Sequence, residues 1–258
     1  MKVSIITSVY NNNKTIKDAI ESVINQTYKN MEYIIVDAGS NDGTIEIVKS
    51  YENKINQFIS EKDKGIYDGL NKGIDLATGD VICFLHSDDL YASEDIITLV
   101  AKEFNNDLCL DGVYGDLVYT PKNDTDKILR YWKSKYFDNS LLKQGWMPAH
   151  PTLFLKREVY EKYGNFDLDF KIAADYDFML RVLKSGIKVK YLPKVLYKMR
   201  VGGESNKSIK NIILKSKEDL KALKINKVGG IFTLIIKNLS KIKQFTNNKN
   251  TNKKGKIK

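Results

Sequence analysis

The first 90 residues alternate between short continuous apolar runs and stretches in which apolar residues recur every three or four positions. Continuous runs of four to eight residues are typical of buried strands, and the wider spacing is typical of amphipathic helices. The pattern predicts strands at 3–9, 32–37, 55–60 and 81–85, and helices at 16–24, 44–51 and 68–77. Gly79 is expected to close the last of these helices as a C-terminal cap. This alternation predicts a parallel sheet that is covered by helices on both faces.

The second half of the chain is less regular. It predicts helices at 93–104 and 175–184, strands at 113–119, 152–155, 189–192 and 195–199, and a long loop at 121–150. The fold class is therefore α/β, with a mostly parallel central sheet flanked by helices and an antiparallel addition at one edge. Residues 206–245 are predicted to form two further helices, separated by Gly229 and Gly230.

The net charge of +10 is concentrated at the end of the chain. From residue 206 onward there are 15 lysines and only two acids, Glu218 and Asp219, whereas residues 1–205 have a small negative net charge. A slightly acidic body argues against nucleic acid as a partner. Residues 246–258 are rich in Asn and Lys and are predicted to be a disordered tail.

The second tail helix carries an apolar stripe with lysines beside it. The stripe consists of Val228, Phe232, Ile235, Leu239, Ile242 and Phe245, and the lysines are Lys237, Lys241 and Lys243. An amphipathic helix flanked by lysines is typical of a protein that lies on an anionic membrane surface, so residues 206–258 are predicted to bind one. The alternatives are that the stripe packs on the body of the protein or on a second copy in a homo-oligomer.

Several classes of protein are excluded by what the sequence lacks. The longest continuous apolar run has five residues (81–85), and the first residues do not have the layout of a signal peptide, so a cytoplasmic protein is expected. Cys83 and Cys109 are interpreted as reduced, buried residues, and with only two histidines they do not make an ordinary zinc site. There is no GxGxxG after the first strand, no GxxxxGK[ST] and no GxSxG. A nicotinamide or flavin site, a P-loop and a hydrolase serine are therefore not expected.

Carboxylates follow three of the predicted parallel strands. Asp37 ends the second strand, Asp63 follows the third, and Asp88 and Asp89 follow the fourth. Ligands of open parallel sheets bind at this edge, where neighbouring acids repel one another unless a cation joins them. Mg²⁺ or Mn²⁺ carrying a diphosphate would satisfy them, because hard cations prefer oxygen ligands. The alternative for each acid alone is that it caps a turn or a helix.

Four segments in order resemble the motifs of family 2 glycosyltransferases with the GT-A fold. They are residues 4–11 (SIITSVYN), 36–44 (VDAGSNDGT), 87–89 (SDD) and 174–177 (ADYD), and the resemblance covers about residues 1–205. Residues 60–68 and 150–152 look like a subgroup that makes bacterial surface polysaccharides. The resemblance implies a catalytic GT-A domain at 1–205, followed by the basic amphipathic helical extension at 206–245 and the tail.

The resemblance also implies an activity and a set of site residues. It implies an inverting, Mn²⁺- or Mg²⁺-dependent transfer from a nucleotide-diphosphate sugar, with UDP favoured, to a saccharide or lipid-linked acceptor, by a peripheral enzyme on the inner face of the cell membrane. Asp175 is the implied general base and Asp89 the implied direct metal ligand. The residues implied to bind the nucleotide sugar are Thr7, Val9, Asp37, Asp63, Asp68, Asp88 and His150.

The chain departs from the family pattern at three positions. His86 replaces an acid at the start of the metal motif, Leu70 replaces an arginine, and Ala174 replaces the acid before the base. Lys64, Lys72 and Arg200 are the candidates for a replacement phosphate contact, and Asp177 is the second choice for the base. The alternative functions are a sugar-phosphate nucleotidyltransferase and a catalytically silent donor-binding or scaffold subunit.

Overall fold

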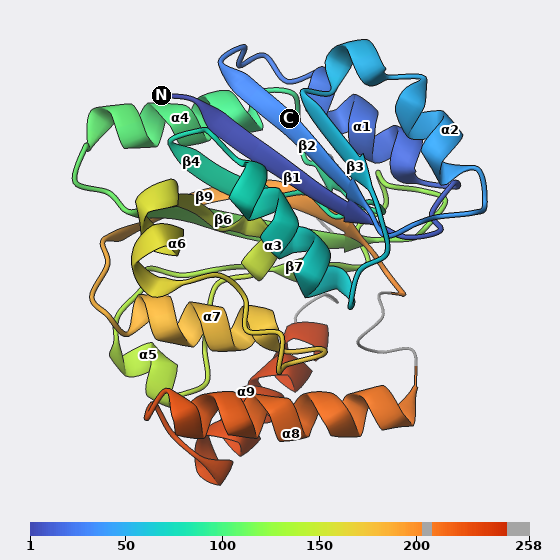
Figure 1. The fold of residues 1–258 in the computed structure, drawn as a ribbon. Helices are drawn as coiled ribbons and strands as arrows, with labels where there is room; N and C mark the ends of the chain where they lie inside the picture. Colours follow the sequence, from blue (N-terminus) through green and yellow to red (C-terminus); the bar gives the residue numbers. More distant parts are fainter. Residues whose placement is uncertain (203–207, 247–258) are drawn as a thin grey trace.

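The computed structural model describes residues 1–202 and 208–246, with side chains placed up to residue 240. Within these residues one nine-stranded sheet runs through the molecule in the order β3-β2-β1-β4-β8-β6-β9-β5, and β7 pairs with β6 (Figure 1). The first four of these neighbours are parallel, as predicted: β3 (Gln57–Ser60), β2 (Met31–Asp37), β1 (Val3–Val9) and β4 (Val81–Phe84). The apolar residues of β1 and β4, and those of β2 from Tyr33 onward, are buried on both faces, which explains why these runs are continuous, whereas those of the edge strand β3 are half-buried.

The rest of the sheet is mixed. It contains β5 (Leu90–Tyr91), β6 (Gly112–Thr120), β7 (Arg130–Trp132), β8 (Phe154–Lys156) and β9 (Val189–Arg200). β6 and β9 are parallel, whereas β8 lies between β4 and β6 and is antiparallel to both. The predicted α/β class is confirmed, but the antiparallel pairing is not confined to an edge of the sheet.

β9 is one strand where the sequence predicted two. The register with β6 shifts between the pairs Tyr114–Tyr191 and Asp116–Val195. Pro193 lies inside this irregular stretch, where its missing N–H breaks no regular ladder bond. On the opposite strand Gly115 allows the close approach, because a Cβ there would lie 2.8 Å from the carbonyl oxygen of Lys194. A proline therefore bends this strand without ending it.

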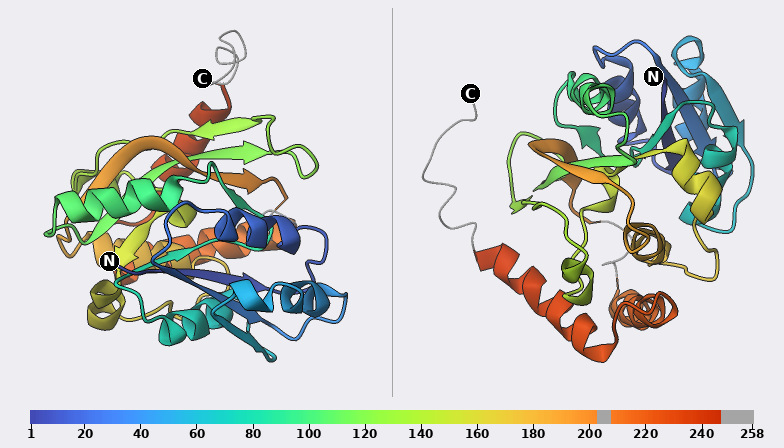
Figure 2. Two further views of the ribbon diagram at one scale, coloured as in Figure 1. Left: turned by 90° about the horizontal axis from the view of Figure 1, so that it is seen from above. Right: turned by 90° about the vertical axis from the view of Figure 1, so that its left-hand side faces the viewer.

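Helices cover both faces of the sheet (Figures 1 and 2). One face packs against α1 (Ile16–Ile24), α2 (Thr44–Lys49) and α4 (Ile96–Asn106). The other packs against α3 (Ile66–Leu76), α6 (Arg157–Tyr163) and α7 (Ala174–Leu183). Alternate residues of β1 serve the two cores: Ile5 lies in the first and Ile6 in the second.

Three further predictions are corrected. Residues 121–150 are not one loop, because they contain β7, α5 (Ser140–Lys143) and the start of a 3-10 turn at His150–Thr152; a second such turn lies at Glu52–Lys54. Gly79 is not a left-handed cap: its N–H donates to Ser4 Oγ and Glu32 Oε1, and a Cβ would collide with Ser4. Cys83 is buried as predicted, but Cys109 is exposed.

The two predicted tail helices are confirmed as α8 (Ile209–Ile225) and α9 (Ile231–Thr246). α8 packs against α7, and α9 packs against α8 and also contacts β7 (Figures 1 and 2). None of the helices in residues 1–202 and 208–246 is long and apolar enough to cross a membrane. The predicted disorder of residues 246–258 is wrong for Thr246, which ends α9, and residues 247–258 lie outside the described residues. The domain boundary near residue 205 also lies outside them and stays a prediction.

Candidate active site

The carboxyl ends of the parallel strands meet at one edge of the sheet. Val9 is the register partner of Asp37, and Asp37 is the register partner of Ser60. The loops that follow carry Asp63 and the Asp88–Asp89 pair to the same edge, as the sequence predicts. An acid-lined edge of this kind is where open α/β sheets bind ligands.

Asp37 is fully buried, and both of its carboxylate oxygens are occupied. Oδ2 accepts hydrogen bonds from the Gly39 and Ser40 N–H groups at 3.0 Å and from Ser60 Oγ at 2.6 Å, and Oδ1 accepts one from Ser40 Oγ at 2.5 Å. These bonds fix the turn between β2 and α2. A nucleotide contact by this side chain would have to share or displace one of these donors, so the contact stays a prediction.

Thr7 and Val9 lie on β1 and do not present their side chains at this edge. Thr7 is buried, and its Oγ1 donates to the Leu85 carbonyl oxygen at 2.7 Å. Val9 belongs to the apolar core. Any contact of these two residues with a nucleotide would therefore run through the main chain.

Asp63 is the more weakly paired of the two predicted site acids after β3, the other being Asp68. Burial, with a smaller contribution from the charge of Asp68, raises its pKa, although Oδ1 accepts the Gly65 N–H at 2.9 Å. Asp68 accepts the Lys64 N–H at 3.0 Å and lies 3.7 Å from Lys72 Nζ. Lys72 also pairs with Glu61 at 2.6 Å, so this candidate for a phosphate contact is held by two carboxylates.

The Asp88–Asp89 turn is held by Arg200. The Arg200 N–H donates to Asp89 Oδ1 at 2.8 Å, and its Nη1 donates to the Asp88 carbonyl oxygen at 2.7 Å. The same guanidinium pairs with Asp18 Oδ2 at 2.5 Å. Arg200 is itself buried, so it shapes this turn instead of reaching out as the free phosphate ligand that the sequence offered.

Asp89 has the chemistry of a cation ligand. It is 2% exposed, and burial, followed by the charge of Asp88, raises its pKa well above the ordinary value. No described residue donates to the side chain of Asp88. Two adjacent carboxylates with so few donors fit a hard divalent cation, which would offset their charge. Within the described residues, no three His, Cys, Asp or Glu side chains gather to hold a metal ion.

Asp175 lies in the first turn of α7 and is partly exposed. Its Oδ1 accepts the Tyr176 N–H at 2.9 Å and lies 3.1 Å from the Tyr67 hydroxyl. Burial opposes ionisation, but the charge of Lys215, an electrostatic interaction with His150, the Tyr67 hydrogen bond and the charge of Lys237 together lower its pKa. Asp175 is therefore a carboxylate at neutral pH and is able to accept a proton.

Asp177, the second choice for the base, has a different environment. It is buried, its Oδ1 accepts a hydrogen bond from Asn226 Nδ2 at 2.7 Å, and its Oδ2 pairs with Arg181 at 3.2 Å. Arg181 also donates to main-chain oxygens at residues 163–165, so Asp177 joins α7 to its neighbours. This geometry favours a structural role for Asp177 and leaves Asp175 as the candidate base.

Two histidines lie between the acidic turn and Asp175. The ring centroids of His86 and His150 are 6.4 Å apart, and the charge of Asp175 acts to raise the pKa of both imidazoles. Burial lowers the pKa of both imidazoles, that of His150 to about 4. His86, which replaces an acid of the family's metal motif, has its Nδ1 buried without a hydrogen-bond partner among the described residues. It is therefore not a core histidine with all of its hydrogen bonds made. Leu70, the other departure on this side, packs in the core.

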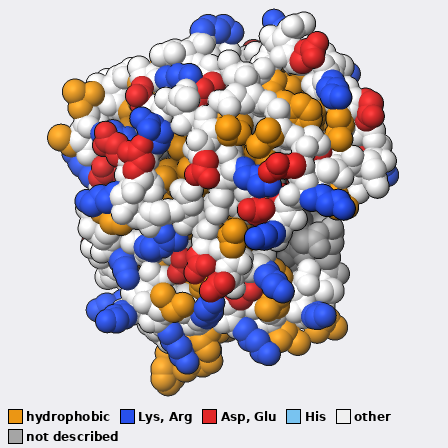
Figure 3. Space-filling model, in the orientation of Figure 1, with side chains coloured by type: hydrophobic (Ala, Val, Ile, Leu, Met, Phe, Trp, Pro, Cys, Tyr) orange, Lys and Arg blue, Asp and Glu red, His pale blue; other side chains and the backbone are white. Residues whose placement is uncertain are grey.

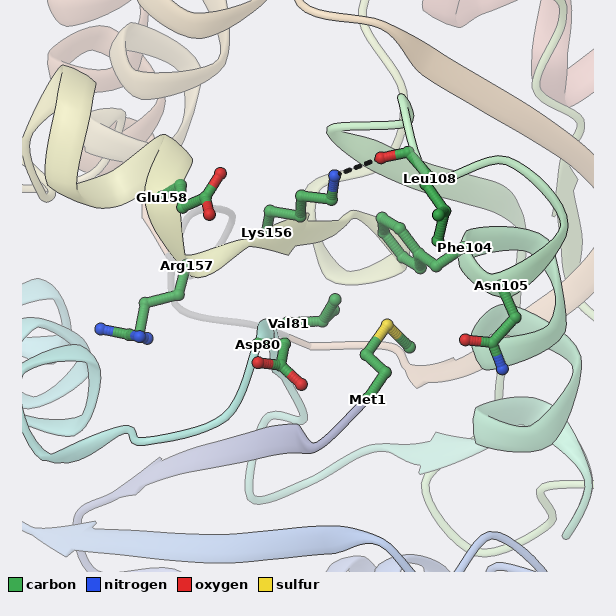
Figure 4. Close-up of a pocket in the computed structure, with 9 residues that line it drawn as sticks. All are labelled: Met1, Asp80, Val81, Phe104, Asn105, Leu108, Lys156, Arg157 and Glu158. Atoms are coloured by element: carbon green, nitrogen blue, oxygen red, sulfur yellow. Dashed lines mark hydrogen bonds between the residues drawn. The ribbon is translucent and has the colours of Figure 1, made fainter.

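The cavity drawn in Figure 4 lies at the opposite edge of the sheet. It has a volume of about 220 Å³ and lies between the start of β1, the start of β4 and the end of β8, with Met1, Asp80 and Lys156 in its lining. Because the predicted site residues follow the carboxyl ends of the strands, this cavity is separate from the candidate active site.

Comparisons with known proteins agree with this architecture. A family model described as glycosyl transferase family 2 matches residues 4–164. A PGL/p-HBAD biosynthesis glycosyltransferase of Mycobacterium tuberculosis is 28% identical over 238 residues, which is 90% of this chain and 88% of the relative. An uncharacterized glycosyltransferase of Rickettsia typhi is 35% identical over 209 residues, which is 77% of this chain and 64% of the relative.

Solved structures show the same fold. TarS 1–349 of S. aureus, in complex with UDP-GlcNAc, superposes with a TM-score of 0.71 and 19% identity over 88% of this chain and 66% of TarS 1–349; this chain spans 39% of the longer TarS structure. The mannosyltransferase PcManGT of Pyrobaculum calidifontis, in complex with GDP-Man and Mn²⁺, gives a TM-score of 0.66 and 18% identity over 99% of this chain and 76% of its own. The sheet and helices described above are thus a GT-A fold.

Proposed function

From the premise that this chain belongs to glycosyl transferase family 2, we propose that it transfers a sugar from a nucleotide-diphosphate donor to a saccharide or lipid-linked acceptor, with inversion, in the synthesis of a bacterial surface polysaccharide. One observation carries the proposal: two sets of carboxylates at the site have pKa values displaced in opposite directions. Burial raises the pKa of Asp63 and Asp89, while the positive charges around Asp175 lower its pKa despite burial. Opposed displacements of this kind mark groups with different chemical tasks.

A UDP-sugar is the favoured donor, and a divalent cation is part of the proposal. TarS is similar to this chain and was solved with UDP-GlcNAc, and PcManGT was solved with GDP-Man and Mn²⁺. Asp89 would be the direct protein ligand, with Asp88 on the cation or the ribose. Bound there, Mn²⁺ or Mg²⁺ would offset the charge that develops on the departing diphosphate.

The proposed chemistry of the chain's own residues is a single displacement. Asp175 accepts the proton of the acceptor hydroxyl as that oxygen attacks the anomeric carbon, and the bond to the diphosphate breaks. Attack from the side opposite the leaving group inverts the configuration. General-base help is worth roughly 10²–10⁴-fold, and the alignment of the two substrates supplies much of the rest.

The test is metal-dependent release of a nucleoside diphosphate. The full chain is incubated with UDP-, GDP- and dTDP-sugars, with and without Mn²⁺, and the products are separated. Release of a nucleoside diphosphate only with Mn²⁺ supports the proposal. Formation of pyrophosphate from a nucleoside triphosphate and a sugar phosphate would identify a nucleotidyltransferase instead, and donor binding without turnover would identify a silent subunit.

We also propose that the extension holds the enzyme on the anionic inner surface of the cell membrane. Lys237 is buried and does not flank the apolar stripe as predicted, and Val228 is partly buried against the core. The apolar residues of α9 nevertheless point outward: Ile231, Phe232, Ile235, Ile236 and Leu239 are all exposed. Thr233, Leu234 and Lys237 form the inner face of the same helix. The side chains from residue 241 onward, including Lys241, Ile242, Lys243 and Phe245, lie outside the described part.

This outward apolar face has cations around it. Lys210, Lys217, Lys221, Lys224 and Lys227 are exposed on α8 and on the turn that follows it. In Figure 3 hydrophobic side chains and lysines lie side by side at the lower end of the molecule, where α8 and α9 form the outer layer. Apolar side chains enter the lipid boundary while each lysine near an anionic surface adds about 1 kcal/mol, so an anionic bilayer fits both features.

Cosedimentation with vesicles tests this part. The full chain should pellet with phosphatidylglycerol vesicles at low salt and less with phosphatidylcholine vesicles. A Phe232→Ser, Ile236→Ser variant should lose most of this binding, whereas Leu108→Ser, at a residue exposed to the same degree elsewhere, should keep it. If the wild type stays in the supernatant, the membrane proposal is wrong, and a dimer in sedimentation velocity would identify a second copy as the occupant.

A further inference from the structure

The helix that carries Asp175 has no cap of its own. Ala173 is the N-cap residue of α7, and its methyl side chain accepts no hydrogen bond. The N–H groups at the start of a helix need partners from elsewhere, and the helix dipole favours an anion there. One of these groups, the Ala173 N–H, and the two N–H groups before it have their partner on a different helix.

The partner is the Glu218 carboxylate of α8. Its Oε1 accepts the Lys171 N–H at 2.9 Å, and its Oε2 accepts the Ile172 N–H at 2.9 Å and the Ala173 N–H at 3.0 Å. Glu218 is buried although it lies in a strongly basic segment. Three charge-assisted bonds to consecutive N–H groups fix both the position and the direction of this stretch of main chain.

The same stretch of main chain contacts the surroundings of Asp175 from the other side. The Tyr67 hydroxyl lies 2.8 Å from the Ile172 carbonyl oxygen and 3.1 Å from Asp175 Oδ1. Asp175 follows Ala173 by two residues. A shift of residues 171–173 would therefore move the Asp175 carboxylate and its Tyr67 contact together.

The extension also holds the two residues that follow Asp175. Tyr176 has Lys237 Nζ 3.1 Å from its ring centroid, and Lys237 pairs with Asp219 at 2.8 Å. Asp177 accepts a hydrogen bond from Asn226 Nδ2. All three of these contacts are buried, and Asp219 lies next to Glu218 on α8. Glu218 thus joins the extension to the start of α7, and Asp219 pairs with the lysine that contacts Tyr176.

We propose that Glu218 is a positioning residue for Asp175, so that the extension forms part of the active site. The proposal rests on the proposed function, in which Asp175 is the general base. Glu218 does not touch the substrates; it acts by holding residues 171–173. Orientation contributes strongly to group transfer, and a displacement of about 1 Å can lower a rate about a hundredfold.

The first test compares two substitutions at this residue. Glu218→Gln keeps the shape of the side chain, but it removes the charge and turns an amide donor toward N–H donors. It should lower kcat for Mn²⁺-dependent release of UDP from a UDP-sugar about tenfold or more, while UDP affinity measured by calorimetry changes less than about twofold. Glu218→Asp keeps the charge on a shorter side chain and should recover part of kcat. Glu158→Gln, at an exposed residue of α6, is the matched control and should leave kcat unchanged.

The second test asks whether Glu218 acts through Asp175. If it does, adding Glu218→Gln to an Asp175→Asn enzyme should cause no further loss of kcat, because groups that act as a unit are not additive. Amide hydrogen exchange at residues 171–173 should become faster in Glu218→Gln. Three outcomes would each overturn the role of Glu218. They are losses of kcat that multiply in the double variant, a kcat of Glu218→Gln within twofold of the wild type, and a loss of UDP affinity in Glu218→Gln as large as its loss of kcat. Absence of turnover in the wild type with every donor would overturn the proposed function first.

Discussion

Glu32 and Asp89 are both buried carboxylates: Glu32 lies near the start of β2, at the amino edge of the sheet, and Asp89 lies in the turn after β4, at the carboxyl edge. Glu32 accepts hydrogen bonds from Lys2 Nζ and Ser4 Oγ at 2.5 Å, from the Thr78 N–H at 2.6 Å and hydroxyl at 2.8 Å, and from the Gly79 N–H at 3.0 Å. Among the described residues, the donors to Asp89 are the Arg200 N–H at 2.8 Å and the Tyr197 hydroxyl. The exposed fractions of the two side chains are similar, but Asp89 lies deeper in the protein and has fewer donors.

The pKa values show the consequence of this difference. Burial alone would raise the pKa of Glu32, but its hydrogen bonds lower it to about 2; at Asp89 burial dominates and the pKa is raised. A buried carboxylate with a full set of donors stabilises the fold. One left with few donors has the capacity to bind something positive, which is the usual origin of perturbed groups at functional sites.

Asp89→Asn should have the largest effect on the carboxyl edge. The amide oxygen still accepts the Arg200 N–H and carries no charge to bury, so Tm should be at or above that of the wild type. Turnover and the Mn²⁺ dependence of donor binding should both be abolished. Turnover assays and Mn²⁺ titration by calorimetry check this, and near-normal activity with unchanged Mn²⁺ affinity would contradict the assignment of Asp89 as the metal ligand.

Asp175→Asn should lower kcat at least about a hundredfold while donor affinity stays near that of the wild type, because a base acts on the acceptor. Asp177→Asn sharpens the test, since it breaks a buried ion pair two residues away and should lower Tm. The two variants are compared by turnover, calorimetry and thermal unfolding. Collapse of donor affinity in Asp175→Asn would place that carboxylate in the donor site instead.

Glu32→Gln should show the reverse pattern. The amide NH₂ of the new glutamine would face hydrogen-bond donors that now point at the Glu32 carboxylate. Because these donors would lose their acceptor, we expect the free energy of unfolding at neutral pH to fall by about 1–3 kcal/mol. Donor turnover per folded molecule should stay within twofold of the wild type. Denaturant unfolding measures the loss, with the exposed Glu52→Gln as control. A Glu32→Gln protein of unchanged stability but lost turnover would remove the contrast between the two edges.

The smallest expected effect is a pH dependence of the stability that Glu32→Gln loses. Because the pKa of Glu32 in the folded chain is about 2, below its ordinary value of 4.5, the unfolded chain binds the proton more readily. The stability that Glu32 contributes is therefore present above pH 4.5 and is lost as the pH falls toward 2. The difference in unfolding free energy between wild type and Glu32→Gln should narrow over this range. A constant difference down to low pH would show that ionisation of Glu32 is not its origin.

Local pattern was enough to predict the first half of the fold. β1 and α1 have the predicted bounds, because continuous apolar runs and three-to-four spacing report directly on burial. The misses share a physical cause, which is that a distant partner decides the outcome. β7 is held by three register pairs with β6, and Pro193 is accommodated by a glycine on the neighbouring strand.

The site was predicted in part for the same reason. The strand-end acids could be found because parallel strands place their carboxyl ends together. The roles of Arg200 and Glu218 could not, because each lies 45 or more residues from the segments that it holds. One signal was present for Glu218: it and Asp219 are the only two acids after residue 205, among 15 lysines. Isolated acids in so basic a segment are candidates for buried side chains that form hydrogen bonds or ion pairs.

The buried contacts of α8 and α9 limit how freely this protein can exchange parts with its relatives. A chimera that joined another protein's tail after residue 202 would leave Tyr176 and Asp177 without Lys237 and Asn226, and the start of α7 without its carboxylate. The family match ends at residue 164, before any of these residues. If Glu218 positions Asp175 as proposed, the smallest piece that can be transplanted as a working unit includes both helices.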